Sequence, residues 1–201
     1  SMKKTVDATG LSCPLPVIET KKALKEMSRG ELEVIVDNTI ALQNLEKMAK
    51  QMGLDHQLET INENKHIIRI LVGDTAGEEA RDVEAAPNVS GKTVVVLSSD
   101  TMGSGDQDLG RVLMKGFVFA LTELDRLPDK VLLYNSGVKL SVAGSDSLGD
   151  LQTLEERGVE ILNCGTCLNF FNLTNELAVG SVTNMYEIVQ SQMEAGTIIQ
   201  P

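Results

Sequence analysis

The sequence predicts an α/β protein with two domains, and three observations lead to this fold class. Residues 74–91 are rich in Gly, Ala and acidic side chains and lack a sustained apolar period, which is typical of a linker. Residues 2–73 have the order strand, helix, strand, helix, strand, strand, whereas residues 92–201 alternate strands with helices. We therefore expect an N-terminal two-layer α/β sandwich (βαβαββ) and a C-terminal, mainly parallel, three-layer α/β domain.

The elements of the first domain follow from apolar periodicity. A short strand at 5–7 precedes a helix at 14–28, and Gly30 ends the helical pattern. A strand at 31–37 leads to a helix at 39–52, which Gly53 ends. Strands at 54–61 and 66–72 are joined by a hairpin-like turn at 62–64. Two helices on one face of this four-stranded sheet would bury enough surface for a domain of about 70 residues.

The elements of the second domain alternate. The run TVVVLS at 93–98 is almost wholly apolar, as in a strand that is covered on both faces. Further strands are expected at 130–135, 159–162, 179–182 and 197–199, and helices at 108–124, 147–157, 164–173 and 184–193. This alternation favours a parallel sheet with helices on both faces. The first of these helices has a broad apolar face that we expect to be buried, made of Leu109, Val112, Leu113, Gly116, Phe117, Ala120, Leu121 and Leu124.

Composition and charge exclude several classes of function. The net charge of −11 is uneven, with 10 basic and 11 acidic residues up to Asp74 but 8 and 18 from Thr75 onward. The acidic second part would repel a phosphate backbone, and aromatic residues are only 3% with no Trp, so nucleic acid is not an expected partner. The longest apolar run, 117–121, is far shorter than the roughly 20 residues of a membrane span, so no membrane is expected either. No apolar stretch follows Lys3 and Lys4, so we expect a cytoplasmic protein whose three cysteines are thiols.

The first cysteine stands between a predicted strand and a predicted helix. Cys13 lies in the segment GLSCPLP, in which Pro14 suits the first position of a helix. We therefore expect Cys13 to be the N-cap, where the helix dipole favours the thiolate, which is the nucleophilic form. Pro16 sharpens this helix start, and Lys21 and Lys22 add weak positive potential. The alternative is a small thiol buried in the core.

This segment resembles the signature of the TusA/SirA family of small sulfur carriers. The likeness covers residues 3–72 and rests on the stretch DATGLSCPLPV with the residues Thr20, Lys21, Lys22 and Ala23. It implies a two-layer α/β fold and a persulfide carried on Cys13. The residues that would support the motif are Asp7, Gly10, Pro14, Pro16 and Lys21.

The other two cysteines form the motif CGTC at 164–167, after a predicted strand. The carboxyl end of a parallel strand is where α/β sheets place reactive groups, and the spacing puts both sulfurs near one helical turn. Cys164, at the cap, is the candidate for the lower pKa. A structural zinc site would need four ligands, and the only other candidates are Cys13, His56 and His66, so we expect no metal and no cofactor. A redox pair, a thiol relay and two packed thiols stay open.

The second domain resembles the DsrE/DsrF-like fold, whose members receive and pass on sulfur on a cysteine. The likeness implies that Cys164 is the acceptor, and Cys167 is an addition that many such proteins lack. Cys167 could attack a persulfide on Cys164, release hydrosulfide and leave a disulfide. The whole fusion resembles the YedF-type proteins linked to selenium metabolism, on the segments MGSGD, LGR, NSGVKL and CGTCL.

These resemblances imply a carrier that passes sulfane sulfur or selenium as a cysteine persulfide, closer to a sulfurtransferase than to a turnover enzyme. The expected partners are a cysteine desulfurase or another persulfide donor, a downstream acceptor protein, and further copies of the chain, because DsrE-like domains commonly associate. Two alternatives stay open. One is a thiol redox or regulatory module that uses the CGTC pair, and the other is an adaptor that needs no reactive thiol.

Three further signals have structural explanations. The segment GSG at 103–105 lacks the lysine of a P-loop and the third glycine of a dinucleotide fingerprint, so we expect a flexible loop, which could still cover the CGTC site. His56 and His66 flank the predicted hairpin turn and are expected to be surface or edge-strand side chains. Met48 and Met52 are expected to fill the core.

Overall fold

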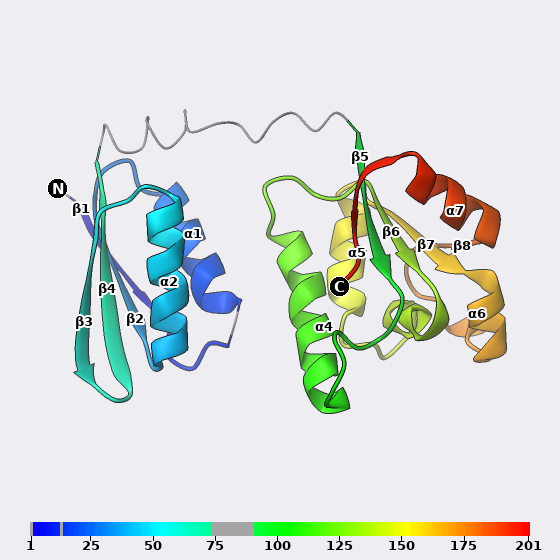
Figure 1. Cartoon of the computed structure of the whole chain (residues 1–201), viewed down its shortest axis with the longest axis horizontal. Coiled ribbons are helices and arrows are strands. Elements are labelled where there is room, and N and C mark those ends of the chain that lie inside the picture. The colour runs from blue at the N-terminus through cyan, green and yellow to red at the C-terminus, as the bar shows by residue number, and fades with distance from the viewer. Residues whose placement is uncertain (1, 13, 74–90) are drawn as a thin grey trace. The chain divides into compact units, whose positions relative to one another are not determined.

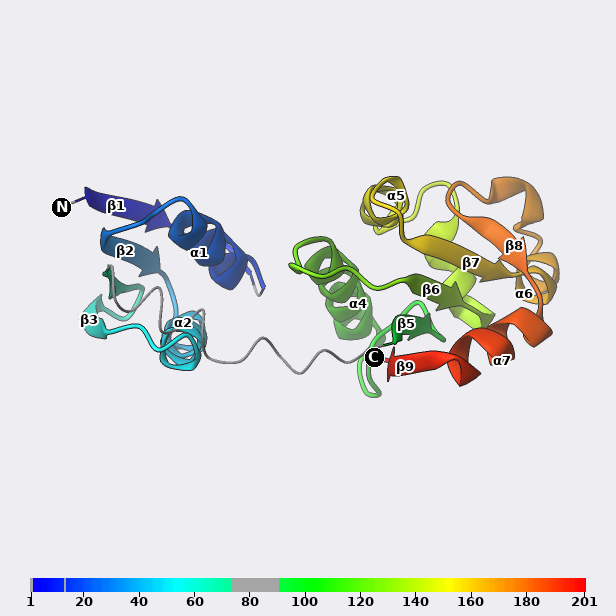
Figure 2. The same cartoon turned by 90° about the horizontal axis from the view of Figure 1, so that it is seen from above.

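The computed structural model describes residues 2–12, 14–73 and 91–201, and the chain divides into two compact units, residues 1–88 and 89–201. The predicted linker at 74–91 lies, apart from Gly91, outside the described residues. Each unit has a sheet and helices of its own, with helices on one face of the first sheet and on both faces of the second (Figures 1 and 2). The predicted fold class is confirmed for both units.

The first unit is a two-layer sandwich. Its strands pair in the order β1-β2-β4-β3, in which β1 runs parallel to β2 and β4 is antiparallel to both of its neighbours. Alternate strand residues turn toward the helices, so Leu32 and Val34 of β2 and Ile68 and Ile70 of β4 are fully buried. The elements are β1 (Met2–Asp7), α1 (Leu15–Lys25), β2 (Gly30–Val36), α2 (Thr39–Gln51), β3 (His56–Asn62) and β4 (Lys65–Val72).

A row of charged side chains crosses the first sheet. A carboxylate oxygen of Glu33 on β2 lies 3.5 Å from Nζ of Lys3 on β1 and 3.4 Å from Nε of Arg69 on β4. Nη1 of Arg69 lies 2.6 Å from a carboxylate oxygen of Glu59 on β3, so the row spans all four strands. Ion pairs near the surface contribute little to stability, so the apolar, helix-covered face holds this sheet together.

The second unit has five parallel strands in the order β8-β7-β6-β5-β9. Helices α4 and α5 cover one face of this sheet and α7 covers the other (Figure 2), so the four residues of β5 from Val94 to Leu97 are fully buried. None of the helices in the described ranges has the length and apolar character needed to cross a bilayer. The elements are β5 (Lys92–Leu97), α4 (Gln107–Thr122), β6 (Lys130–Leu133), the 3₁₀ helix η1 (Asn135–Ser141), α5 (Leu148–Glu156), β7 (Glu160–Cys164), α6 (Gly165–Phe170), η2 (Thr174–Glu176), β8 (Ser181–Thr183), α7 (Met185–Met193) and β9 (Ala195–Ile199).

The prediction of the buried face of α4 is largely wrong. Leu109, Val112 and Leu113 are 56%, 66% and 44% exposed. Gly110 explains why the helix turns another side inward, because a Cβ atom there would lie 2.9 Å from Cβ of Thr101. The helix has two apolar stripes, and the one that contains the glycine can approach the loop between β5 and α4 more closely. The residues of α4 that are buried are Gly110, Met114, Val118, Leu121 and Thr122, of which only Leu121 belongs to the predicted face.

The expected surface position of His66 is also wrong. The residue is only 2% exposed, because β4 is an internal strand of its sheet. One ring nitrogen lies 3.0 Å from Oγ1 of Thr60 and the other lies 3.2 Å from the carbonyl oxygen of Glu63. His66 is therefore a buried side chain that fastens the β3–β4 hairpin. Met48 is buried and Met52 packs against the same core, as predicted.

Candidate functional site

The structure describes the residues on either side of Cys13 at the start of α1, whereas Cys13 itself lies outside the described residues. The carbonyl oxygen of Pro14 accepts the first helical hydrogen bond at 3.1 Å, and α1 begins at Leu15. Pro14 is therefore at the N-cap position and Pro16 is the second helical residue. The prediction that Pro14 is the first helical residue and Cys13 the cap is wrong by one position. The cause is a turn before the helix, in which the N–H of Leu15 donates to the carbonyl oxygen of Ser12 at 2.9 Å.

The loop before Cys13 is tied to the end of β2 through Asp37. Nδ2 of Asn38 and the backbone N–H of Gly10 each donate to the Asp37 carboxylate at 2.8 Å, and these two bonds hold the pKa of Asp37 below its ordinary value of 3.8. Gly10 has a φ of +79°, in the left-handed region that favours glycine. Oδ1 of Asn38 accepts the N–H of Ala41 at 2.8 Å and so caps α2.

Asp7, the last residue of β1, also forms a hydrogen bond within the loop before Cys13. Its Oδ1 accepts the backbone N–H of Thr9 at 3.0 Å, and hydrogen bonds from Thr9 lower the pKa of Asp7. The N–H of Leu11 then donates to the carbonyl oxygen of Ala8 at 3.2 Å, which closes a turn. Asp7 and Asp37 therefore serve as ionised acceptors that shape the backbone before the cysteine.

A cavity of about 270 Å³ opens at this loop. Its wall includes Ser12 and Pro14, which are the neighbours of Cys13 in the sequence, together with the first turn of α2. Lys21 is exposed and is not part of the wall, so a role for its charge stays a prediction. The lining residues are Gly10, Leu11, Ser12, Pro14, Pro16, Val17, Asp37, Asn38, Ile40, Ala41 and Asn44.

Cys164 is the last residue of β7 and the N-cap of α6, as predicted, but its sulfur is not open to approach. The residue is 3% exposed and belongs to the core of the second unit, so the end of this strand does not expose a reactive thiol, contrary to the prediction. Gly165 explains this burial, because a Cβ atom there would lie 2.8 Å from Cγ1 of Val182. The first turn of α6 therefore presses against β8 and encloses the cysteine before it.

Cys167 lies in the first turn of α6, as predicted, and is half-buried. Its Sγ accepts a hydrogen bond from the backbone N–H of Asn135 at 3.0 Å. Asn135 has a φ of +51°, which is uncommon for a residue with a side chain. Burial and a hydrogen bond with Cys164 raise the pKa of Cys167 above its ordinary value of 9.0, and the N–H of Asn135 opposes this shift.

Glycine at 137 allows the turn that carries Asn135 to rest on the end of β5. A Cβ atom at Gly137 would lie 2.1 Å from the carbonyl oxygen of Leu97, which also accepts the N–H of Tyr134 at 3.2 Å. The hydroxyl of Ser136 accepts the N–H of Asp100 at 3.2 Å. The donor to Cys167 is therefore held by the ends of two neighbouring strands.

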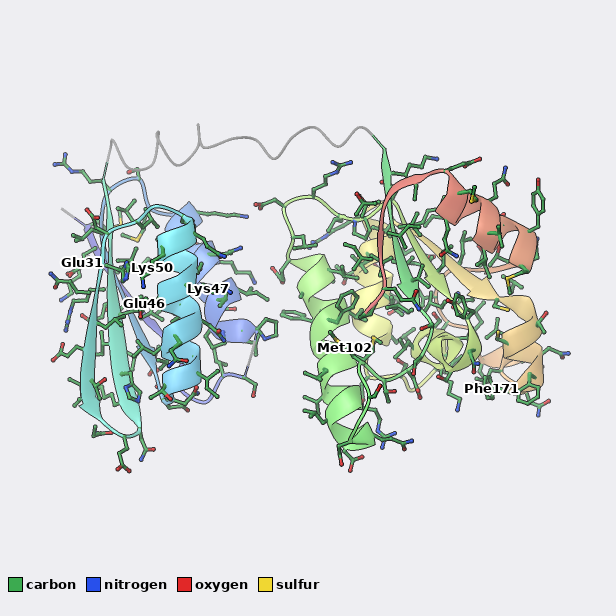
Figure 3. All side chains as sticks on the ribbon, viewed as in Figure 1. Glu31, Glu46, Lys47, Lys50, Met102 and Phe171 are labelled. Atoms are coloured by element: carbon green, nitrogen blue, oxygen red, sulfur yellow. The ribbon has the colours of Figure 1, made fainter. Side chains whose placement is uncertain are left out.

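Lys139 provides a second contact between η1 and α6. Its Nζ lies 4.6 Å from the ring centre of Phe171, whose ring meets that of Phe170 edge to face at 5.2 Å. Phe171 lies at the end of α6 (Figure 3). It follows Cys167 by four residues. Because residues four apart lie on one side of a helix, η1 contacts the same side of α6 at both Cys167 and Phe171.

Sequence reasoning missed Asp37, Asn38 and Asn135. The pair Asp37–Asn38 before a predicted helix is a capping signal and could have been found. Asn135 after an apolar strand is a weaker signal, because asparagine suits many kinds of turn. Within the residues that the structure describes, no group of three or more His, Cys, Asp or Glu side chains is placed to hold a metal ion.

The chain is similar to known proteins both in sequence and in structure. The family model described as sulfurtransferase TusA matches residues 4–72. The putative sulfur carrier protein MJ0990 of Methanocaldococcus jannaschii is 50% identical over 54 residues, which are 26% of this chain and 71% of that protein. A SirA-like protein from Desulfitobacterium hafniense of known structure is 42% identical, over 35% of this chain and 97% of its own, with a TM-score of 0.34. The ychN protein of E. coli is 18% identical, over 55% of this chain and 99% of its own, with a TM-score of 0.44.

Proposed function

The chain belongs to the TusA family through residues 4–72, and we propose that it is a sulfur carrier in which Cys13 bears the sulfur as a persulfide. The observation that carries this proposal is the cavity of about 270 Å³ whose wall includes Ser12 and Pro14. A cavity at this point of the loop would admit the sulfur-bearing end of a donor. In this proposal Asp7, Gly10, Pro14 and Pro16 shape the loop, and Lys21 supplies positive charge along α1.

Loading is an exchange between sulfur atoms. The Cys13 thiolate attacks the outer sulfur of a donor persulfide, a new S–S bond forms, and the donor's S–S bond breaks with its electron pair on the departing thiolate. The transferred sulfur keeps its oxidation state, so no external oxidant is required. Unloading is the same reaction with the thiolate of an acceptor protein. A cysteine desulfurase, or another protein that carries a persulfide, is the matching donor.

We further propose that Cys164 and Cys167 form a second acceptor site in the DsrE-like part of the chain. Two observations support this: the contact between the two thiols, and the backbone N–H directed at the sulfur of Cys167. Selenium undergoes the same exchange as sulfur, and the likeness of the fusion to YedF-type proteins favours a role in selenium metabolism within the cytoplasm. Association of copies of the chain belongs to the same proposal.

The contact between Cys164 and Cys167 also favours an alternative function, a thiol redox pair. Such a pair would cycle between two thiols and a disulfide, with a partner disulfide or persulfide as the oxidant. A third function, an adaptor without thiol chemistry, would use none of the three cysteines.

Intact-mass spectrometry after incubation with a cysteine desulfurase and cysteine separates these functions. A carrier gains about 32 Da for each sulfur atom, a redox pair loses two hydrogen atoms, and an adaptor is unchanged. Cys13→Ala should abolish the gain on the peptide of the first unit. Ser28→Ala, which changes an exposed side chain of the same unit outside the cavity wall, should retain it. A wild-type chain that stays unmodified while the desulfurase turns over would contradict the proposal.

A further inference from the structure

We infer that Cys167 is the thiol of the second unit that receives sulfur, and that the backbone N–H of Asn135 stabilises the negative charge on its Sγ. Cys164 is then the buried thiol that contacts Cys167 and does not meet the donor. This exchanges the roles that the resemblance to DsrE-like proteins gives to the two cysteines. The inference rests on the proposed function for the cargo, whereas the order of the two thiols rests on their surroundings alone.

Access separates the two sulfurs. An incoming persulfide must bring its outer sulfur into line with the attacking thiolate, so the receiving thiol needs an open side. Cys164 is enclosed, because β7 pairs it with Thr183 of β8 and Gly165 lets α6 close against the same strand. Cys167 keeps part of its surface exposed. A donor can therefore reach Cys167 without moving α6.

The hydrogen bond from Asn135 marks Cys167 as the sulfur at which negative charge is stabilised. Negative charge resides on the attacking sulfur and returns to it when the persulfide is passed on. An N–H group 3.0 Å away favours the charged form, and it does so best when it is fixed in advance. The turn of Asn135 is fixed by the carbonyl oxygen of Leu97, against which both Tyr134 and Gly137 rest. The side chain of Cys164 makes no capping hydrogen bond to the first turn of α6.

The contact between the thiols gives Cys164 a defined second step. Its thiolate attacks Sγ of a loaded Cys167, and a bond forms between the two cysteine sulfurs. The bond to the outer sulfur breaks, and that atom leaves with the electron pair as hydrosulfide. The two cysteines are oxidised and the outer sulfur is reduced, so the step balances without another reagent. A persulfide on Cys167 should therefore live longer when Cys164 is removed.

The first test measures thiol reactivity in the full chain with Cys13→Ser. Native protein is treated briefly with iodoacetamide, and each cysteine peptide is quantified by mass spectrometry. We expect Cys167 to be alkylated at least about tenfold faster than Cys164. Equal rates, or a faster Cys164, would overturn the inference whatever cargo the protein carries, because alkylation involves no sulfur transfer.

The second test addresses Asn135. Asn135→Gly keeps both the N–H and the left-handed backbone, whereas Asn135→Val opposes a φ of +51° and displaces the donor. Alkylation of Cys167 should fall about tenfold in the valine variant and change less than about twofold in the glycine variant. Asn172→Val is the matched control, because Asn172 has a φ of +57° and its N–H bonds to Asn169. If alkylation of Cys167 slowed equally in both valine variants, the effect would come from strain in the fold and not from the N–H of Asn135. If Asn135→Val does not fold, the ranking of the two thiols still decides the inference.

The third test supplies glutathione persulfide in place of a protein donor. Cys167→Ala should abolish the mass gain in the second unit, whereas Cys164→Ala should retain it and prolong its lifetime. The opposite result assigns sulfur acceptance to Cys164 and overturns the inference. If neither the two variants nor the parent chain gains sulfur, the proposal of a second acceptor site is refuted. Faster alkylation of Cys167 would then still show that it is the more reactive of the two thiols.

Discussion

The carboxylate of Asp37 and the backbone N–H of Gly10 are joined by a hydrogen bond of 2.8 Å, although 27 positions separate them in the sequence. This bond connects the end of β2 to the loop before Cys13. Asn38, the next residue, caps α2. Two adjacent side chains therefore fix both the loop and the helix that line the cavity, and Asp37 is a positioning residue.

Replacing Asp37 should loosen this loop. In Asp37→Ala we expect faster hydrogen exchange at the Gly10 amide and slower persulfide loading of Cys13, because the acceptor of the Gly10 N–H is lost. Asp55→Ala, which removes an exposed carboxylate of the same unit, is the control. Loading at the wild-type rate in Asp37→Ala would show that the bond has no part in positioning.

The lowered pKa values of Asp7 and Asp37 predict an acid-sensitive first unit. A carboxyl group whose pKa is lower in the folded than in the unfolded chain stabilises the fold above its ordinary value of 3.8. That contribution is lost as the pH falls through the lowered pKa. The melting temperature of the first unit, followed from about pH 6 to about pH 2, should fall less steeply in the double variant Asp7→Asn, Asp37→Asn. Parallel curves would contradict this assignment.

The raised pKa of Cys167 predicts the pH dependence of its alkylation. The midpoint of the rate profile should lie above 9.0, because burial and the contact with Cys164 favour the neutral thiol. The stability contributed by this group is present below 9.0 and is lost as the pH rises through the raised pKa. Cys164→Ala removes one of the two causes and should move the midpoint down. A midpoint below 9.0 in the parent chain is the outcome that would refute the expectation.

The orientation of α4 can be tested with two identical substitutions. Val118 is fully buried and Val112 is 66% exposed. Val118→Ala should lower the free energy of unfolding by about 2 kcal/mol, from lost burial and the remaining cavity. Val112→Ala should change it by less than about 0.5 kcal/mol. Urea unfolding measures both, and similar losses would mean that the helix faces the sheet differently.

We predict that the fold requires glycine at position 137 but tolerates alanine at position 149. A Cβ atom at Gly137 meets the carbonyl oxygen of Leu97 at 2.1 Å, whereas one at Gly149 of α5 meets nothing within 4 Å. Gly137→Ala should lower the melting temperature and slow alkylation of Cys167, because the turn of Asn135 must move. Gly149→Ala should be neutral or stabilise by up to about 1 kcal/mol, since alanine suits a helix better. Equal effects would remove the assigned role of Gly137.

Periodicity predicts elements well where one pattern dominates, as in the buried run of β5 or the hairpin closed by residues 63 and 64. It misleads at α4, where two apolar stripes compete and a contact of Gly110 with Thr101 decides between them. It also cannot foresee that Cys164 is enclosed, because this depends on how closely α6 approaches β8 at Gly165. The N–H of Asn135 is a backbone group, so the type of side chain at this position does not predict its hydrogen bond to Cys167.

The pairing of β5 with β9 sets the order in which the chain can fold as it is made. The four strands of the first unit are complete at Val72, and neighbouring segments form most of its pairings. In the second unit β5 is the first strand, yet one of its edges is covered only when residues 195–199 arrive. Until then an apolar strand has an open edge, which is the condition under which nascent chains aggregate. Contacts so distant in sequence form slowly, so the first unit can fold on the ribosome while the sheet of the second is still incomplete.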